Sequence, residues 1–547
     1  MGYRDIIFSV RRDENENLLN IKLEMNNLEG VSKVQLYKGK VNIKEIYSDT
    51  YYEMDDNFLF LESKETNLII DYKVQIGALG KHGRLGALNN DLISFMGEQI
   101  LILPVNVLTL KDYEKLDYDI EINFSKLEGA FENNILQYNF QSIIPFKEDK
   151  FISKCKRANW SDLYELMKSA YVFGYFEKKS FFEEEGKISL YIDWTSSLIN
   201  KDSKVYENIR NICRYYFDLF KSSKKFKKNI DIVLLRKEEG EHPYILGGSG
   251  KNIISATFDE KEKRDWQLLS HRLFHGFMDS KLVSRIYHLP PNLWLTEGLA
   301  TYYENLALES LNDNLKESLS INFNKELNKL YVRYLYMTLK EPNRYRIIPM
   351  EEAGIKSHGK LEFLHYTKAP LLVYLIENSI KNNKNSIVKY LIENSENEFS
   401  MQDLFYKLFG NNIENFASNY LFGNALLPLW NIKEDISDEE LINWINEYEY
   451  IMWTWFQKEE EFYTKDNITL EEQYKIEKVL DKSNIVIYNK DITSNVEKYS
   501  NLLLNIIKLW LLKEQVLNVT YNDLNLRYKL LKDEINLKAW NNFLENN

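Results

Sequence analysis

Two histidines four residues apart are the first feature of this sequence that could do chemistry. His271 and His275 lie in the segment SHRLFHGFMDS. On a helix, this spacing places both imidazoles on one face, where they can hold one cation. Glu297 follows 22 residues after His275, in the segment WLTEGLATYYE, where we expect a second helix after the turn at Pro290-Pro291. Two histidines and one carboxylate make a three-ligand catalytic zinc set with a fourth position open for water.

The segment around these residues resembles the gluzincin metallopeptidases, in particular the glycyl aminopeptidase-like group (peptidase family M61) and the alanyl aminopeptidase-like group. Their pattern is HExxH, followed further along the chain by WxxEGxxxYxE. The resemblance implies that His271, His275 and Glu297 are the ligands of one zinc ion. It also implies that Tyr366, in the segment HYTKA, stabilises the oxyanion of a tetrahedral intermediate. The surroundings of the third ligand are matched by Trp294, Gly298, Tyr302 and Glu304.

Two departures from the family pattern each remove an acidic group. Arg272 stands where the family has its general-base Glu, and a guanidinium stays protonated and cannot accept a proton from water. Its fixed charge also weakens the binding of a nearby divalent cation. The stretch GGSGKN matches the family's substrate-binding edge strand, so Gly247, Gly248, Lys251 and Asn252 would contact the ligand. It lacks the Glu that anchors a free amino group, and Lys251 predicts a preference for an acidic group.

These residues leave three functions open. In the first, the chain is a pseudopeptidase that binds a peptide or protein ligand in an interdomain groove without cleaving it. In the second, it is an active zinc-dependent metallo(amino)peptidase in which Tyr366, Glu304 or another carboxylate replaces the general base. In the third, it is a structural scaffold whose metal site is empty, with Arg272 paired to Glu297 or Glu304.

The composition excludes several other classes of function. The 547 residues carry 70 basic and 82 acidic side chains, a net charge of -12 that does not favour a nucleic-acid partner. The most apolar run, Ile100 to Leu110, is too short to cross a membrane and contains Pro104. With only Cys155 and Cys213 and no recognisable signal peptide, we expect a cytoplasmic protein without membrane partners.

The elements that must position the site predict a multidomain α+β protein. Short alternating runs such as Lys33–Tyr37 and Leu68–Val74 predict a β-sandwich-like N-terminal domain over residues 1–150. The family resemblance implies a thermolysin-like (gluzincin) middle domain over 151–430. Residues 431–547 contain neither Gly nor Pro and show helical periodicity, which predicts an all-helical C-terminal domain.

Within the middle domain, the pattern predicts the elements around the site individually. We expect strands at Lys187–Trp194 and Asn229–Arg236, with an amphipathic helix over Ser203–Ser222 between them. We also expect helices over Asp162–Gly174 and Ala369–Asn383.

Overall fold

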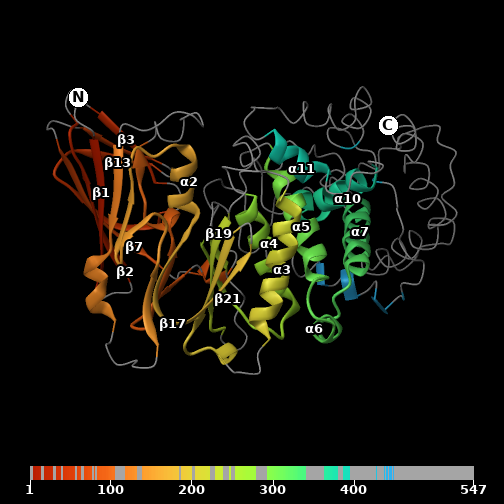
Figure 1. Ribbon diagram of the computed structural model, residues 1–547. Coiled ribbons are helices and arrows are strands. Elements are labelled where there is room, and N and C mark those ends of the chain that lie inside the picture. Colours follow the sequence, from red (N-terminus) through yellow and green to blue (C-terminus); the bar gives the residue numbers. More distant parts are fainter. Residues whose placement is uncertain are drawn as a thin grey trace, which may run out of the picture. The chain divides into compact units, whose positions relative to one another are not determined.

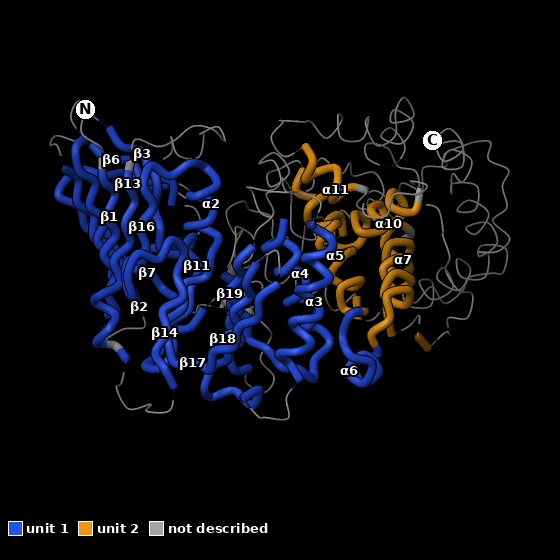
Figure 2. The backbone as a smooth tube through the Cα atoms, in the orientation of Figure 1, with its two compact units in different colours: residues 1–285, 310–320 blue, residues 286–309, 321–547 orange. Residues whose placement is uncertain are grey.

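The structure is a computed structural model, and it describes two compact units (Figure 2). Unit 1 comprises Met1–Arg285 and Ser310–Ser320, and unit 2 comprises Ile286–Glu309 and Ile321–Asn547. The described residues run from 4 to 448, except 14–17, 29–32, 39–40, 56–57, 63–66, 77–78, 81–82, 85, 105–117, 132–137, 184–185, 200–203, 222–227, 238–244, 248–252, 279–291, 341–362, 380–385, 395–419, 421–426, 428–436, 438, 441–442 and 446.

Unit 1 begins with two β-sheets that share one core (Figure 1). Buried and partly exposed side chains alternate along their strands, as in β2 and β7, because successive side chains point to opposite faces of a sheet. The seven-stranded sheet has the order β15 (Lys147–Asp149), β16 (Ile152–Cys155), β13 (Tyr118–Asn123), β1 (Arg4–Arg12), β2 (Leu18–Met25), β7 (Leu68–Gln75) and β4 (Ile43–Ser48). The four-stranded sheet has the order β12 (Leu103–Pro104), β3 (Lys33–Tyr37), β6 (Phe58–Glu62) and β5 (Tyr52–Met54).

A third sheet of unit 1 carries the helix with the two histidines. Its strands β18, β19 and β21 are parallel, whereas β20 pairs antiparallel with β21 at the end of the strand order. The order is β10 (Ala87–Leu88), β11 (Leu92–Met96), β17 (Ala170–Glu183), β18 (Gly186–Asp193), β19 (Lys228–Leu235), β21 (Ile253–Thr257) and β20 (Ile245–Gly247), with β14 (Asn139–Ile143) also paired to β17. The other elements of unit 1 are β8 (Leu79–Gly80), β9 (Gly83–Arg84), η1 (Gly97–Gln99), η2 (Ser125–Ala130), η3 (Ser197–Ile199) and the helices α2 (Trp160–Lys168), α3 (Val205–Phe220), α4 (Lys263–Phe277) and α6 (Asp313–Ser318).

The described elements of unit 2 are all helical. They are α5 (Leu293–Leu308), α7 (Phe323–Lys340), the π-helix η6 (Leu364–Lys368), α10 (Ala369–Ser379) and α11 (Ser386–Glu393). Among the described helices, none combines the length and apolar character needed to cross a membrane.

Most predicted elements around the site are confirmed. The strands expected at Lys187–Trp194 and Asn229–Arg236 are β18 and β19, and the helix expected over Ser203–Ser222 is α3. The helix expected from Ala369 is α10. The domain boundaries near residues 150 and 430 stay predictions. Residues 449–547, which hold most of the predicted C-terminal domain, lie outside the described residues.

The predicted helix Asp162–Gly174 is wrong in its second half. Helix α2 ends at Lys168, and β17 begins at Ala170. The segment AYVFGYF is rich in aromatic residues and pairs with β11 on one side and β14 on the other. Pairing on both sides therefore overrides the helical pattern that continues from α2.

Replacing Gly186, at the start of β18, tests how closely β18 and β19 pack in the third sheet. A Cβ atom at Gly186 would lie 1.7 Å from the carbonyl oxygen of Lys228 on β19. We expect Gly186→Ala to lower the free energy of unfolding by about 1–3 kcal/mol, because the strands must separate. Gly129→Ala is the matched control, since a Cβ there meets nothing within 4 Å. Urea unfolding curves measure both, and equal effects would contradict the prediction.

Candidate metal centre

The two histidines lie on one face of α4, as their spacing predicts. Both side chains are buried, with 8% of His271 and 7% of His275 exposed. Their Nε2 atoms are 3.1 Å apart. Two ring nitrogens that converge in this way can serve one cation or share one hydrogen bond between neutral rings.

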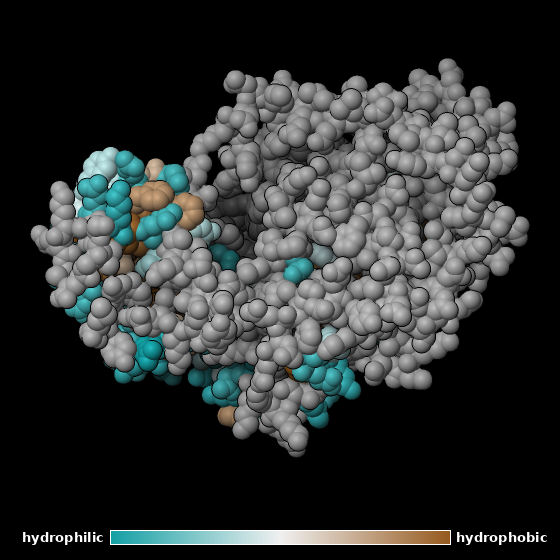
Figure 3. Space-filling view, turned by 90° about the horizontal axis from the view of Figure 1, so that it is seen from above, coloured by the Kyte–Doolittle hydropathy of each residue, from teal (hydrophilic) through white to brown (hydrophobic). Residues whose placement is uncertain are grey.

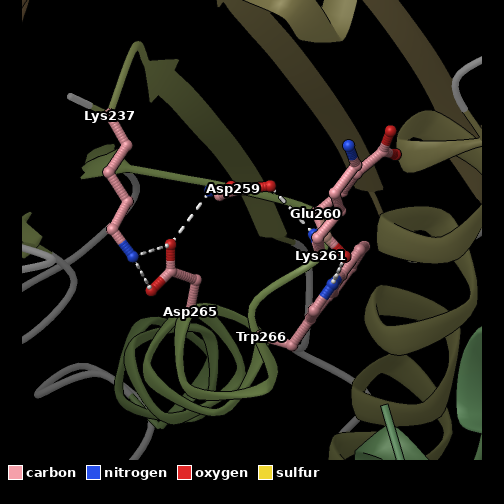
Figure 4. A network of polar contacts seen from close by, with 6 residues as sticks. All are labelled: Lys237, Asp259, Glu260, Lys261, Asp265 and Trp266. Carbon is pink, nitrogen blue, oxygen red and sulfur yellow. Dashed lines mark hydrogen bonds and ion pairs between the residues drawn. The ribbon is translucent and has the colours of Figure 1, made fainter. Parts of the chain in front are cut away.

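A buried ion pair holds the first turn of α4 (Figure 4). The Lys237 ammonium lies 2.9 Å from each carboxylate oxygen of Asp265, whose side chain is completely buried. The backbone N–H of Asp259 donates to the same carboxylate at 2.9 Å. Burial raises the pKa of Asp265, and the hydrogen bond and charge of Lys237 oppose that rise. The residues that follow β19 and β21 are thereby tied to the helix that carries the histidines.

Two further residues, Trp266 and Ser270, hold the part of the helix that follows this ion pair. The indole N–H of Trp266 donates to the carbonyl of Glu260 at 2.9 Å, and its ring packs edge-to-face on Phe258. From α3, the Tyr216 hydroxyl donates to the carbonyl of Ser270 at 2.9 Å. Ser270 directly precedes His271, so this bond holds the turn that carries the first histidine.

Glu297 lies on α5, which approaches α10 closely. The next residue, Gly298, allows this approach, because a Cβ there would lie 2.7 Å from the Cβ of Ala369. The methyl group of Ala369, which stands where the family pattern has Gly, therefore lies against the position that a side chain at residue 298 would occupy. One ligand atom each from His271, His275 and Glu297 lies within 4.8 Å of the others.

The π-helix η6 carries His365, Tyr366 and Lys368 directly before α10. Tyr366 is half-buried. His365 is buried, and within the described part of the chain its Nε2 has no hydrogen-bond partner. Burial lowers the pKa of His365, and the charge of Glu297 opposes this effect. Burial also lowers the pKa of Lys368 to about 8.

Of the remaining predicted site residues, Arg272 and Gly247 are among the described residues. Arg272 is half-buried on α4 between the histidines. Gly247 is the last residue of β20, at the end of the strand order. Gly248, Lys251 and Asn252 lie outside the described residues. The catalytic, metal-binding and substrate-binding roles of all these residues stay predictions.

Sequence reasoning did not find the polar residues that support α4. Lys237 and Asp265 are 28 positions apart and belong to no motif. The π-helix also leaves no mark in the periodicity of residues 363–379. For Asp265, the available signal was its charge together with its place in the first turn of the helix that bears the histidines.

Comparisons with known proteins show what this fold is similar to. No protein-family model matches the sequence, and no curated protein matches it. Among solved structures, it is similar to an aminopeptidase N family protein from Idiomarina loihiensis, with 13% identity, a TM-score of 0.55, and 80% of this chain and 78% of that chain covered. An M1 zinc metallopeptidase from Deinococcus radiodurans matches at 13% identity and a TM-score of 0.46, over 80% and 96% of the two chains. The first likeness shows a mixed α/β fold of the aminopeptidase N kind, with a β-rich N-terminal region and a helical part after it.

The donor set of this candidate centre fits zinc. Two imidazoles and one carboxylate are the protein ligands that a catalytic zinc site needs, and the ring nitrogens already converge. The carbonyl and hydroxyl bonds to Ser270 hold the backbone of α4 directly before His271.

Replacing Lys237 tests the ion pair that holds α4. Lys237→Met leaves the Asp265 carboxylate buried without its cation, which raises the folded-state pKa of Asp265 further. Because an unfolded Asp ionises near about pH 3.9, the stability lost should grow as the pH rises above that value, reaching about 3–5 kcal/mol at neutral pH.

Urea unfolding at pH 4 and at pH 7 measures this loss. The control is Lys179→Met, which breaks the exposed pair with Glu177 and should cost less than about 1 kcal/mol. A loss for Lys237→Met that is equally large at both pH values would contradict the role of the ionised carboxylate.

Proposed function

We propose that this protein has a metallopeptidase fold, binds one zinc ion and a peptide or protein ligand, and has lost hydrolysis. One observation carries the proposal. The three ligand residues are kept with their ligand atoms within 4.8 Å, while Arg272 occupies the position of the general base. Selection for hydrolysis would retain the base, whereas selection for a metal-supported binding site needs only the ligands.

The residues explain why hydrolysis is lost. Zinc, when bound, supplies a Lewis acid that lowers the pKa of a coordinated water. Arg272 has no lone pair to accept a proton from that water. Its guanidinium is half-buried, so solvent screens part of its repulsion toward a cation. We therefore expect zinc binding to be weakened by Arg272 and not abolished.

Peptide binding is supported by the edge of the third sheet. Strand β20 pairs with β21 on one side and ends the strand order on the other. A strand in this position offers backbone N–H and C=O groups to an extended ligand, which is the general mode of β-strand addition.

A second candidate function is a slow metallohydrolase, and Glu304 favours it. Glu304 lies two helical turns after Glu297 on α5, and its side chain is buried. A buried carboxylate on the same helix as the third ligand is a chemically suitable base. Loss of the usual base costs about 10²- to 10⁴-fold in rate, so any surviving turnover would be slow.

Metal content is the direct test of the ligand set. Protein purified without a His tag and dialysed against zinc should hold about one zinc per chain, as expected for a three-ligand site. His271→Ala should lose it, because two ligands bind far more weakly than three. Elemental analysis measures both, with His365→Ala as a control histidine outside the ligand set. Zinc absent from the wild-type protein would support the empty scaffold.

Arg272→Glu tests whether the missing base explains the loss of hydrolysis. We expect no chelator-sensitive peptide cleavage by the wild-type protein, and about tenfold tighter zinc binding in Arg272→Glu because a repulsive charge becomes an attractive one. Arg272→Gln, which removes only the charge, is the matched control and should lie between them.

Cleavage by the wild-type protein would contradict the proposal. If that cleavage also disappears in Glu297→Ala and in Glu304→Gln, the slow metallohydrolase is the better description. If Glu297→Ala leaves the rate unchanged, the cleavage does not come from this site.

A further inference from the structure

The four-stranded sheet of unit 1 has an outward face that takes no part in the hydrophobic core of the described residues. On β3 and β6, the inward side chains, such as Leu36 and Leu59, are buried in the core. The alternate residues point to the other side. The register places Gln35, Phe60 and Glu53 in one row across β3, β6 and β5. We call this the outward face, and its other members are Lys33, Tyr37, Tyr51, Asp55, Phe58 and Glu62.

The outward face exposes aromatic side chains. Tyr51 is 64% exposed and Phe60 is 38% exposed. Phe58 links Phe60 to Tyr37, with ring centroids 6.2 and 5.8 Å apart. Figure 3 shows a patch of hydrophobic residues with hydrophilic neighbours on the described surface. Exposed aromatic rings in contact with one another are typical of protein interaction sites.

The same face is acidic. Its members include three acidic residues, Glu53, Asp55 and Glu62, and one basic residue, Lys33. In the part of the chain that the structure describes, no lysine or arginine forms an ion pair with Glu53 or Glu62. The Tyr51 hydroxyl donates to Glu53 at 2.9 Å, and this bond, with the charges of Glu53 and Glu62, raises the pKa of Tyr51. The rings therefore lie beside two carboxylates. Glu62 lies opposite Lys33 across the strand pair, whereas Glu53 lies opposite Phe60 and has no cation as its register partner.

We propose that the outward face binds an extended, basic segment of a partner protein. Arginine and lysine are the side chains that can both pair with carboxylates and lie over aromatic rings. The carboxylates would repel nucleic acid and an anionic membrane. A purely apolar partner would bury Glu53 and Glu62 without a counter-charge, which is costly.

The strand order favours an extended partner. β5 is the last strand of its sheet, so it has no neighbour on its outer side within that sheet. An extended segment beside β5 would continue the rows of the outward face, with every second side chain above Glu53 and the rings. This inference is independent of the metal centre, because it rests on β3, β5 and β6 alone.

A synthetic peptide in which arginine alternates with valine is the probe. Fluorescence anisotropy with the full-length chain should show micromolar binding at low salt that weakens as salt is added. A peptide in which glutamate alternates with valine should not bind. The double variant Glu53→Lys/Glu62→Lys should weaken binding of the basic peptide by about tenfold or more, because two attractive charges become repulsive.

Matched variants separate this face from general attraction to an acidic protein. Phe60→Ser should weaken binding several-fold, whereas Phe182→Ser, which removes a ring that is 70% exposed on β17, should not. Glu207→Lys, on exposed α3 surface, should also leave binding unchanged.

Three outcomes would overturn the proposal. The first is no binding of the basic peptide, and the second is equal weakening by Glu207→Lys and by the double variant. The third is self-association of the chain that the double variant abolishes, measured by light scattering. That result would assign the outward face to a second copy instead of a partner segment. Circular dichroism confirms that each variant is folded.

Discussion

The arrangement of the candidate centre depends on one buried ion pair, between Lys237 and Asp265. A helix that presents two imidazoles from a protein interior cannot be held by apolar packing alone, because its polar face resists burial. Asp265 receives an ammonium and a backbone N–H, so the first turn of α4 is anchored by charge-assisted bonds to the segments after β19 and β21. Tyr216 then holds the turn that bears His271. These bonds determine where the two histidines lie.

In unit 2, the helix that bears Glu297 is held by close packing instead of by charged groups. Gly298 lets α5 and α10 approach until the Cβ of Ala369 fills the space of the missing side chain. The π-helix η6 directly precedes that contact, and π-helical turns are frequent at functional sites. It buries Lys368 and leaves the Nε2 of buried His365 without a partner in the described chain.

The local features of this site could be predicted from the sequence, and the long-range ones could not. The spacing of His271 and His275 determines a shared helix face, and alternation determines strands such as β7, because both depend on neighbours along the chain. The helix predicted over Asp162–Gly174 ends early because β11 and β14 pair with the segment after Lys168, and the sequence pattern carries no information about those partners. The Lys237–Asp265 pair has the same character, since neither residue belongs to a periodic pattern or a motif.

The contact between the histidines also explains how Arg272 can be tolerated. With Nε2 atoms 3.1 Å apart, two neutral imidazoles satisfy each other with one hydrogen bond, so the pair does not need a cation to remain buried. Here the position of α4 rests on contacts of Asp265, Trp266 and Ser270, none of which involves a metal ion.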